Sequence, residues 1–183
     1  MRRIAVLFFV ALIIGGCTNY EETPEPGVLE VYFTSNQDDI DSLGITDGDI
    51  LLLGVREIVV YRDDSAFSYV YPSLDYYEDT TRVVNVFEME DSTFTPVLAG
   101  QTYFPPGRYT DIYFTAEPFE VAIIGGGWIP ITLYGSSNIY LPCDITIDER
   151  DTTRVILQFE TAQSIYRWRD EYRCNPVFTL KIQ

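Results

Sequence analysis

The sequence predicts an all-β fold, and more specifically a single antiparallel β-sandwich with one or two short helical turns. Apolar side chains repeat mostly at every second residue, as in strands that bury one face. The apolar segments are short and are separated by residues that favour turns. Ten prolines are spread along the chain and disfavour long helices. About eight to ten short strands arranged in this way are typical of a sandwich.

The period of two is clearest near the two ends of the predicted domain. Leu29, Val31 and Phe33 share one face of the first strand, and a later strand alternates in the same way between Arg154 and Glu160. Gly54 interrupts the long apolar run over 50–62 and predicts a bulge or bend. The expected strands are 28–34, 50–62, 83–89, 109–115, 119–124, 128–134, 153–160 and 176–182. The helical candidates are 38–43 and 162–170.

The first residues have the pattern of a lipoprotein signal peptide. Two arginines precede an apolar run over 4–14, which as a helix rises about 16 Å, well short of the ~30 Å that a bilayer span needs. The sequence Ile14-Gly15-Gly16-Cys17 resembles the lipobox of bacterial lipoproteins. We therefore expect residues 1–16 to be cleaved and Cys17 to be acylated. The alternative is an ordinary secretory signal, which would usually show an A-x-A-like site, and none is present.

The segment that follows the cysteine indicates how the domain is attached. Residues 17–27 are polar and acidic and contain two prolines, so we interpret them as a tether between the lipid and a domain over 28–183. The acylated Cys17 is then the link to the membrane. By resemblance to Gram-negative lipoproteins, Thr18 in place of Asp favours a cell-envelope location at the outer membrane.

The charge balance and the absence of histidine exclude several classes of function. Removing residues 1–16 leaves 10 basic and 28 acidic side chains, a net charge of −18. Such a chain offers no basic face for nucleic acid. The sequence has no histidine, which excludes Ser-His-Asp and Cys-His nucleophiles and histidine-based zinc sites. We expect no cofactor.

Two cysteines remain after Cys17, namely Cys143 and Cys174. In an oxidising envelope an even pair predicts a disulfide, which in the chain-entropy model would contribute up to roughly 3–4 kcal/mol. The alternative is a pair of buried free thiols.

Three segments carry a resemblance to a known family. They are the opening strand GVLEVYFT from Gly27, the sequence FPPGRYT from Phe104, and the sequence VILQFETAQSI from Val155 followed by Asn175-Pro176-Val177. The second resembles an L-P-x-G-x-Y turn and the third an F-D-A-x-x-S-I element of bacterial envelope lipoprotein domains of unknown function. This resemblance implies a transthyretin-like sandwich, close in architecture to an immunoglobulin-like one. Ser35-Asn36 and Glu160 depart from the family pattern, and the family has no established activity to transfer.

The acidic and glycine-rich segments are interpreted as loops. Asp38-Asp39-Ile40-Asp41 and Asp47-Gly48-Asp49 lack the spacing of an EF-hand, which predicts a solvated acidic loop. The sequence from Asp148 to Asp151 predicts a hairpin turn. Gly125-Gly126-Gly127 lacks the Lys-Ser or Lys-Thr of a phosphate loop and predicts a flexible turn.

A tyrosine-rich segment is the candidate binding surface. Tyr69, Tyr71, Tyr76 and Tyr77, with Tyr61 nearby, lie in or around the sequence SAFSYVYPSLDYYEDT. Such a cluster can form an aromatic platform for a glycan or protein partner. The alternative is that several of these rings pack on the sandwich and the others decorate it.

Together these features predict a lipid-anchored envelope module with a structural, adhesive or ligand-binding role and no catalytic residues. The alternative is a carboxylate-based or calcium-dependent hydrolase of glycans, which would need two facing carboxylates in a pocket. A third possibility is a subunit of a surface assembly with an unpaired edge strand.

Overall fold

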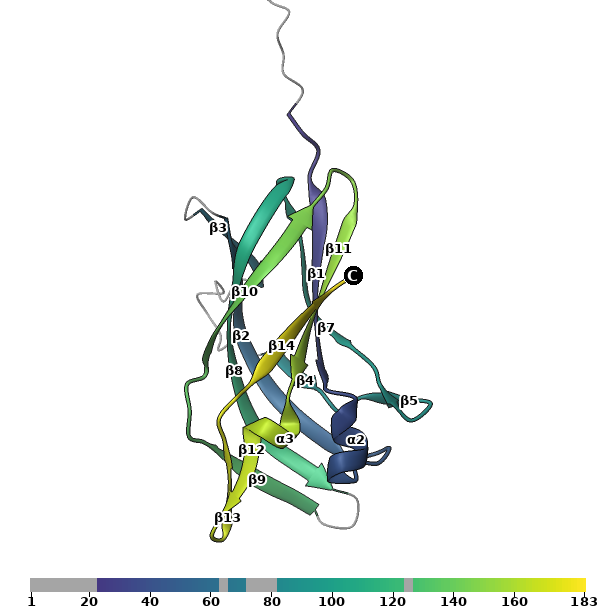
Figure 1. Cartoon of the computed structure of the whole chain (residues 1–183), viewed down its shortest axis with the longest axis vertical. Coiled ribbons are helices and arrows are strands. Elements are labelled where there is room, and N and C mark those ends of the chain that lie inside the picture. Colours follow the sequence, from purple (N-terminus) through teal and green to yellow (C-terminus); the bar gives the residue numbers. More distant parts are fainter. Residues whose placement is uncertain (1–22, 63–65, 72–81, 124–126) are drawn as a thin grey trace, which may run out of the picture.

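The computed structural model describes residues 23–62, 66–71, 82–123 and 127–183 (Figure 1). Within them the chain is almost entirely β, with two short helices, so the predicted all-β class is confirmed. None of the helices in these ranges has the length and apolar character needed to cross a membrane.

The first of the two larger sheets has four strands in the order β14-β11-β1-β7. Its strands are β1 (Gly27–Ser35), β7 (Val97–Phe104), β11 (Thr152–Phe159) and β14 (Phe178–Ile182). β1 pairs antiparallel with β7 but parallel with β11, with Val31 opposite Val155. The expected purely antiparallel sheet is therefore wrong at this pair. The residues before β11 cross over from the other sheet, so β11 can enter beside β1 in the same direction.

The second sheet has eight strands. Its main path is β12-β13-β9-β8-β2-β3, while β10 pairs with β8 and β4 pairs with β2. Its strands are β2 (Ile50–Tyr61), β3 (Phe67–Tyr71), β4 (Arg82–Asn85), β8 (Gly107–Ile123), β9 (Gly127–Leu133), β10 (Asn138–Ile147), β12 (Ile165–Trp168) and β13 (Glu171–Cys174). A small hairpin of β5 (Met89–Glu90) and β6 (Thr93–Phe94) projects from the body.

Apolar side chains of the two larger sheets meet in one core. Phe33 of β1 lies 5.4 Å from Phe114 of β8 between ring centroids, in an edge-to-face arrangement. Phe178 of β14 contacts the same two rings at 6.0 and 4.9 Å. Edge-to-face aromatic pairs add about 0.5–1.5 kcal/mol beyond the area they bury. These rings therefore join the two sheets.

Two expected strands, 109–115 and 119–124, are one long strand. β8 continues through Pro118, which pairs opposite Leu53 beside a shift in register between Leu52 and Leu53. Because proline has no amide hydrogen, an irregularity in the ladder allows it to remain in a strand. A second shift follows between Val55 and Ile58, so the bulges flank Gly54, as the sequence indicated.

The first helical prediction is confirmed and the second needs correction. α2 (Asp38–Leu43) ends at Gly44, whose φ of 68° is left-handed. α3 covers only Thr161–Ser164, and the chain then enters β12 instead of continuing as a helix. β12 pairs with β13 along its whole length, and those ladder bonds replace the helical ones.

The sequence from Asp148 to Asp151 joins β10 to β11, which lie in different sheets. It is therefore an arch between sheets and not the expected hairpin turn. The arch also fixes the entry of the chain, because Arg150 forms an ion pair with Glu25 and the Val28 amide donates to the Asp151 carbonyl at 2.8 Å. Figure 1 shows the N-terminal segment leaving at this end, while α2, α3, β12 and β13 lie at the opposite end.

Phe104-Pro105-Pro106-Gly107 also connects the two sheets, from β7 to β8. Gly107 has a φ of +148°, and Arg62 packs where a side chain at this position would lie. The buried Tyr109 donates its hydroxyl to the Pro105 carbonyl at 2.8 Å. This proline–glycine turn therefore serves the fold.

Candidate functional site: an aromatic sheet face

Four neighbouring strands, β3, β2, β8 and β10, present one face to the core and one to solvent. On β2, Ile58 and Val60 are fully buried in the core. Because side chains alternate along a strand, Val59 and Tyr61 point to the other face of the sheet. Val59 is nevertheless buried, although it lies outside the core cluster. Tyr69 and Tyr113 are its direct partners on the two adjacent strands. An aromatic layer therefore covers this face.

The layer is a continuous chain of five rings, which we call the aromatic face: Tyr69, Phe67, Tyr61, Tyr140 and Tyr113. Successive ring centroids are separated by 5.7, 6.0, 6.4 and 4.7 Å. The Tyr61 and Tyr140 rings are stacked, with an interplanar angle of 29°. Phe67 and Tyr140 are 53% and 64% exposed, so the apolar ring surface is open to solvent.

Hydrogen-bonding groups border one end of the aromatic face. The Tyr113 hydroxyl donates to the Asn138 side-chain carbonyl at 3.2 Å and lies 3.3 Å from the Thr115 hydroxyl. Burial, together with the neighbouring Tyr140 hydroxyl, raises the pKa of Tyr61 above its ordinary value. The Tyr61 phenol therefore stays neutral near pH 7 and can both donate and accept a hydrogen bond.

The structure places the tyrosines predicted from sequence in different ways. Tyr61 and Tyr69 belong to the aromatic face, and Tyr71 is the last residue of β3, opposite Ile58. Tyr76 and Tyr77 lie outside the described residues. Sequence reasoning missed Phe67, Tyr113 and Tyr140, although Tyr113 and Tyr140 sit at outward alternating positions of β8 and β10. The missing information was which strands are neighbours.

The structure holds Cys143 and Cys174 as separate free thiols, which corrects the expected disulfide. Cys143 belongs to β10 and contacts the Tyr109 carbonyl of β8, with its sulfur 3.8 Å away. Cys174 ends β13 and pairs with Leu133 of β9. The pairing of β10 with β8 thus fixes the position of Cys143, and the pairing of β13 with β9 fixes that of Cys174. Burial raises the pKa of Cys143 to about 11 and that of Cys174 to about 12.

An apolar cavity lies at the end opposite the N-terminal segment. It has a volume of about 270 Å³, and among its described lining residues Asp49 is the only carboxylate. One oxygen of Asp49 accepts the Thr46 amide at 2.7 Å and the Thr46 hydroxyl at 2.9 Å. The described lining therefore lacks the pair of facing carboxylates that the hydrolase alternative needs. Nor do the described ranges hold any group of three acidic, cysteine or histidine side chains for a metal.

Two other buried carboxylates hold the fold together near α3. Asp39, which was expected in a solvated loop, is only 5% exposed and accepts the Thr161 amide at 2.7 Å. Glu160 accepts hydrogen bonds from the side-chain NH₂ of Asn36 and from the Thr179 hydroxyl, both at 2.6 Å. Burial raises the pKa of Asp39, partly offset by its backbone hydrogen bonds. Glu160 stands at the Asp position of the segment that resembles F-D-A-x-x-S-I. Its carboxylate is thus used for hydrogen bonds within the fold.

Comparison with known proteins adds little to this description. No family model and no solved structure matches the chain. Two curated relatives are 34% identical to it over 65 residues, and both are L-cysteine:1D-myo-inositol 2-amino-2-deoxy-alpha-D-glucopyranoside ligases of Mycobacterium leprae, strains Br4923 and TN. The match includes 36% of this chain and only 16% and 15% of the two ligases.

Cys17, the expected lipidation site, lies outside the described residues.

Proposed function

We propose that this protein is a lipid-anchored module of the bacterial cell envelope that binds an uncharged glycan on its aromatic face, without catalysis. The observation that carries the proposal is the chain of five rings from Tyr69 to Tyr113 across the solvent side of one sheet. Sheet faces turned to water usually carry scattered polar side chains, whereas a continuous apolar ring surface marks a binding site.

A sugar is the ligand that best suits this surface. Sugar rings have apolar C–H faces that pack on aromatic rings, and hydroxyls around their edge that need hydrogen-bond partners. The aromatic face supplies both, because Tyr113, Thr115 and Asn138 border the rings. Asp111 lies directly across from Tyr61, and the chain has a formal charge of −16, so the surroundings disfavour anionic glycans.

The buried carboxylates favour a binding role over the hydrolase alternative, because they are engaged in hydrogen bonds within the protein. Asp39, Asp49 and Glu160 all accept hydrogen bonds from neighbouring protein groups. A general acid or nucleophile has to reach its substrate instead.

We further propose that the two larger sheets form a single sandwich of the transthyretin type, anchored through acylated Cys17 to the outer membrane of a Gram-negative bacterium. Aromatic contacts between Phe33 of one sheet and Phe114 of the other support the sandwich. The anchor rests on the lipobox-like sequence. Since β1 begins at the end from which the N-terminal segment leaves, an anchor there would direct α2, α3 and β13 away from the lipid surface (Figure 1).

The test is a glycan array probed with the mature protein in mild detergent, followed by calorimetry on any sugar retained. We expect binding of neutral glycans that Tyr140→Ala weakens at least about tenfold, a loss typical for one stacking ring. Tyr103→Ala is the matched control, because Tyr103 is 76% exposed on β7 of the other sheet. An array without a neutral hit, or equal loss in both variants, would overturn the proposal.

A further inference from the structure

The hairpin of β12 and β13 has two unlike faces. Ile165 and Tyr172 pack against the core and line the apolar cavity, and Cys174 is buried within the core. Tyr166 and Trp168 of β12 pair with Arg173 and Glu171 of β13, so these four side chains share the opposite face. Trp168 is 47% exposed there. This outer face carries aromatic and charged groups that the core does not use.

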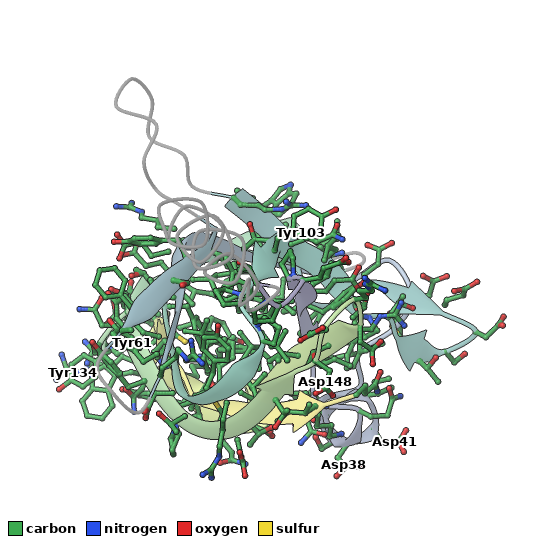
Figure 2. All side chains as sticks on the ribbon, turned by 90° about the horizontal axis from the view of Figure 1, so that it is seen from above. Asp38, Asp41, Tyr61, Tyr103, Tyr134 and Asp148 are labelled. Carbon is green, nitrogen blue, oxygen red and sulfur yellow. The ribbon has the colours of Figure 1, made fainter. Side chains whose placement is uncertain are left out.

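Arg173 is stacked between two exposed rings on this face. Its guanidinium carbon lies 5.3 Å from the Trp168 ring centre and 5.0 Å from that of Tyr134, which follows β9. Glu171 accepts a hydrogen bond from the Arg173 Nε at 2.6 Å. Figure 2 shows Tyr134 on the side of the molecule away from Asp38 and Asp41 of α2. The stack fixes the orientation of both rings before any ligand arrives.

The tip of the hairpin is hollowed beside this stack. The hollow has a volume of about 300 Å³ and is lined by Trp168, Arg169, Asp170, Glu171 and Arg173. It thus combines one exposed ring for stacking with both donors and acceptors of hydrogen bonds. A ring-shaped polyol matches that combination, whereas a flat bilayer surface would not fill a hollow.

The hairpin is also unusually basic for this chain. Residues 166–173 contain three arginines and two acidic residues, a local charge of +1, in a protein whose formal charge is −16. Four arginines elsewhere, in β2, β8, β11 and the arch before β11, are ion-paired with carboxylates. Among the described residues, Arg167 and Arg169 form no ion pair, as is also true of Arg62 and Arg82. Arg169 therefore places in the hollow a cation that forms no ion pair with the described residues, although Asp170 and Glu171 also line the hollow.

We propose that the hollow at the β12–β13 tip is a second saccharide site, distinct from the aromatic face and selective for sugars that carry a carboxylate. The sugar ring stacks on Trp168, and its carboxylate is held by Arg169 through charge-assisted hydrogen bonds. The carboxylate of Glu171 repels the carboxylate of the sugar and already accepts a hydrogen bond from Arg173. Glu171 therefore limits the affinity of the site. At the end remote from the N-terminal segment, this site faces away from the proposed anchor (Figure 1).

The experiment compares, by calorimetry on the mature protein, a galacturonate trisaccharide with the neutral galactose trisaccharide of the same linkage. We expect Trp168-dependent binding of the acidic sugar only, weaker at 500 mM than at 50 mM salt. Any neutral sugar held by the aromatic face should be lost in Tyr140→Ala and unaffected by Trp168→Ala. Trp168→Ala should reduce affinity about tenfold or more and Trp168→Phe much less, because the ring is the platform. Arg169→Gln should reduce affinity severalfold, and Glu171→Gln should increase it.

Lys181→Gln on β14 is the matched control, because it removes the same charge outside the hollow. It should leave affinity unchanged, as should Tyr140→Ala, which separates this site from the aromatic face. Circular dichroism and thermal unfolding of each variant verify the fold. The proposal is overturned if the acidic sugar does not bind, if Trp168→Ala weakens binding of the neutral sugar as much as that of the acidic sugar, or if Trp168→Ala and Lys181→Gln have equal effects.

Discussion

The ring of Tyr140 lies 4.7 Å from the ring of Tyr113, directly across the ladder between β10 and β8. Both side chains point away from the core, and Tyr140 stacks in turn on Tyr61. Tyr140 therefore links the rings of β2 and β8 into one surface. Cross-strand aromatic pairs of this kind contribute roughly 0.2–1 kcal/mol to a sheet, which is too little to explain so long a chain of rings by stability alone.

Replacing Tyr140 with alanine should separate binding from folding. We expect glycan affinity to fall at least about tenfold while the free energy of unfolding falls by no more than about 1 kcal/mol, because the ring is 64% exposed. Urea unfolding followed by fluorescence measures the second quantity. A loss of several kcal/mol would instead identify Tyr140 as a structural residue.

Replacing Phe33 with alanine should instead reduce mainly the free energy of unfolding. Phe33 is fully buried and contacts Phe114 of the other sheet and Phe178 of its own sheet. We expect a loss of about 3–5 kcal/mol in the free energy of unfolding, since the cavity lies where the two sheets meet. Urea unfolding curves provide the value, and Tyr103→Ala on the surface should change it by less than about 0.5 kcal/mol. Equal effects of the two variants would contradict the assigned core.

The parts of the fold that could be predicted from sequence are those fixed by local alternation. Leu29, Val31 and Phe33 of β1 alternate with polar residues and are buried as expected. Pro118 suggested a break between strands, but β8 accommodates it with one extra residue, Phe119, opposite the step from Leu52 to Leu53 of β2. The local sequence does not reveal this bulge, because it is defined by the register against β2, a strand more than sixty residues earlier in the chain.

The candidate site was predictable only in part for the same reason. Tyr61 and Tyr69 are close in sequence, and their clustering indicated a binding surface. Tyr113 and Tyr140 join them through the pairing of β8 with β2 and β10, which depends on long-range register. The buried Asp39 was mistaken for a loop residue because its partner amides, Thr161 and Ala162, come from α3.

Asp39 should make the stability of the protein depend on pH in an unusual direction. Its pKa is raised in the folded state, chiefly by burial, so the folded state binds a proton more tightly than the unfolded state. Lowering the pH from 7 through this raised pKa should therefore stabilise the wild-type protein relative to Asp39→Asn, which does not titrate. Urea unfolding of both proteins at pH 7 and pH 5 measures the difference. A wild-type protein that loses stability relative to Asp39→Asn at pH 5 would contradict the raised pKa.

Asp39→Ala tests the structural part of the same contact. The Thr161 amide, 2.7 Å from the carboxylate, loses its acceptor in this variant. We expect a cost of about 1–3 kcal/mol at pH 7, larger than for Asp39→Asn, whose side-chain carbonyl still accepts the bond.

The two thiols should limit stability at high pH. Because the pKa is about 11 for Cys143 and about 12 for Cys174 in the folded protein, both thiols stay protonated there while those of the unfolded chain ionise near pH 9. Their contribution to stability is complete below about pH 9 and is lost as the pH rises through 11 and 12. Unfolding measured from pH 8 to pH 11 should show the decline, and replacing both cysteines with serine should reduce it.

Labelling gives a second measure of the same thiols. At pH 8 the native protein should react slowly with a thiol reagent, because the reactive thiolate is scarce and Cys174 is fully buried. Denaturation without a reductant should expose two reactive thiols per mature chain. A denatured protein that does not react would restore the disulfide interpretation.

Cys17→Ser should release the protein from membranes. Several acyl chains at about 0.8 kcal/mol per buried CH₂ would anchor the mature chain almost irreversibly, whereas the polar residues after Cys17 offer no apolar surface of their own. Detergent-phase partitioning of protein expressed in a Gram-negative host should therefore move from the detergent phase to the aqueous phase in Cys17→Ser. Cys143→Ser is the matched control and should stay with the detergent. Wild-type protein whose N-terminus is intact and unmodified by mass spectrometry would overturn the anchor, and the assigned compartment would lose its basis with it.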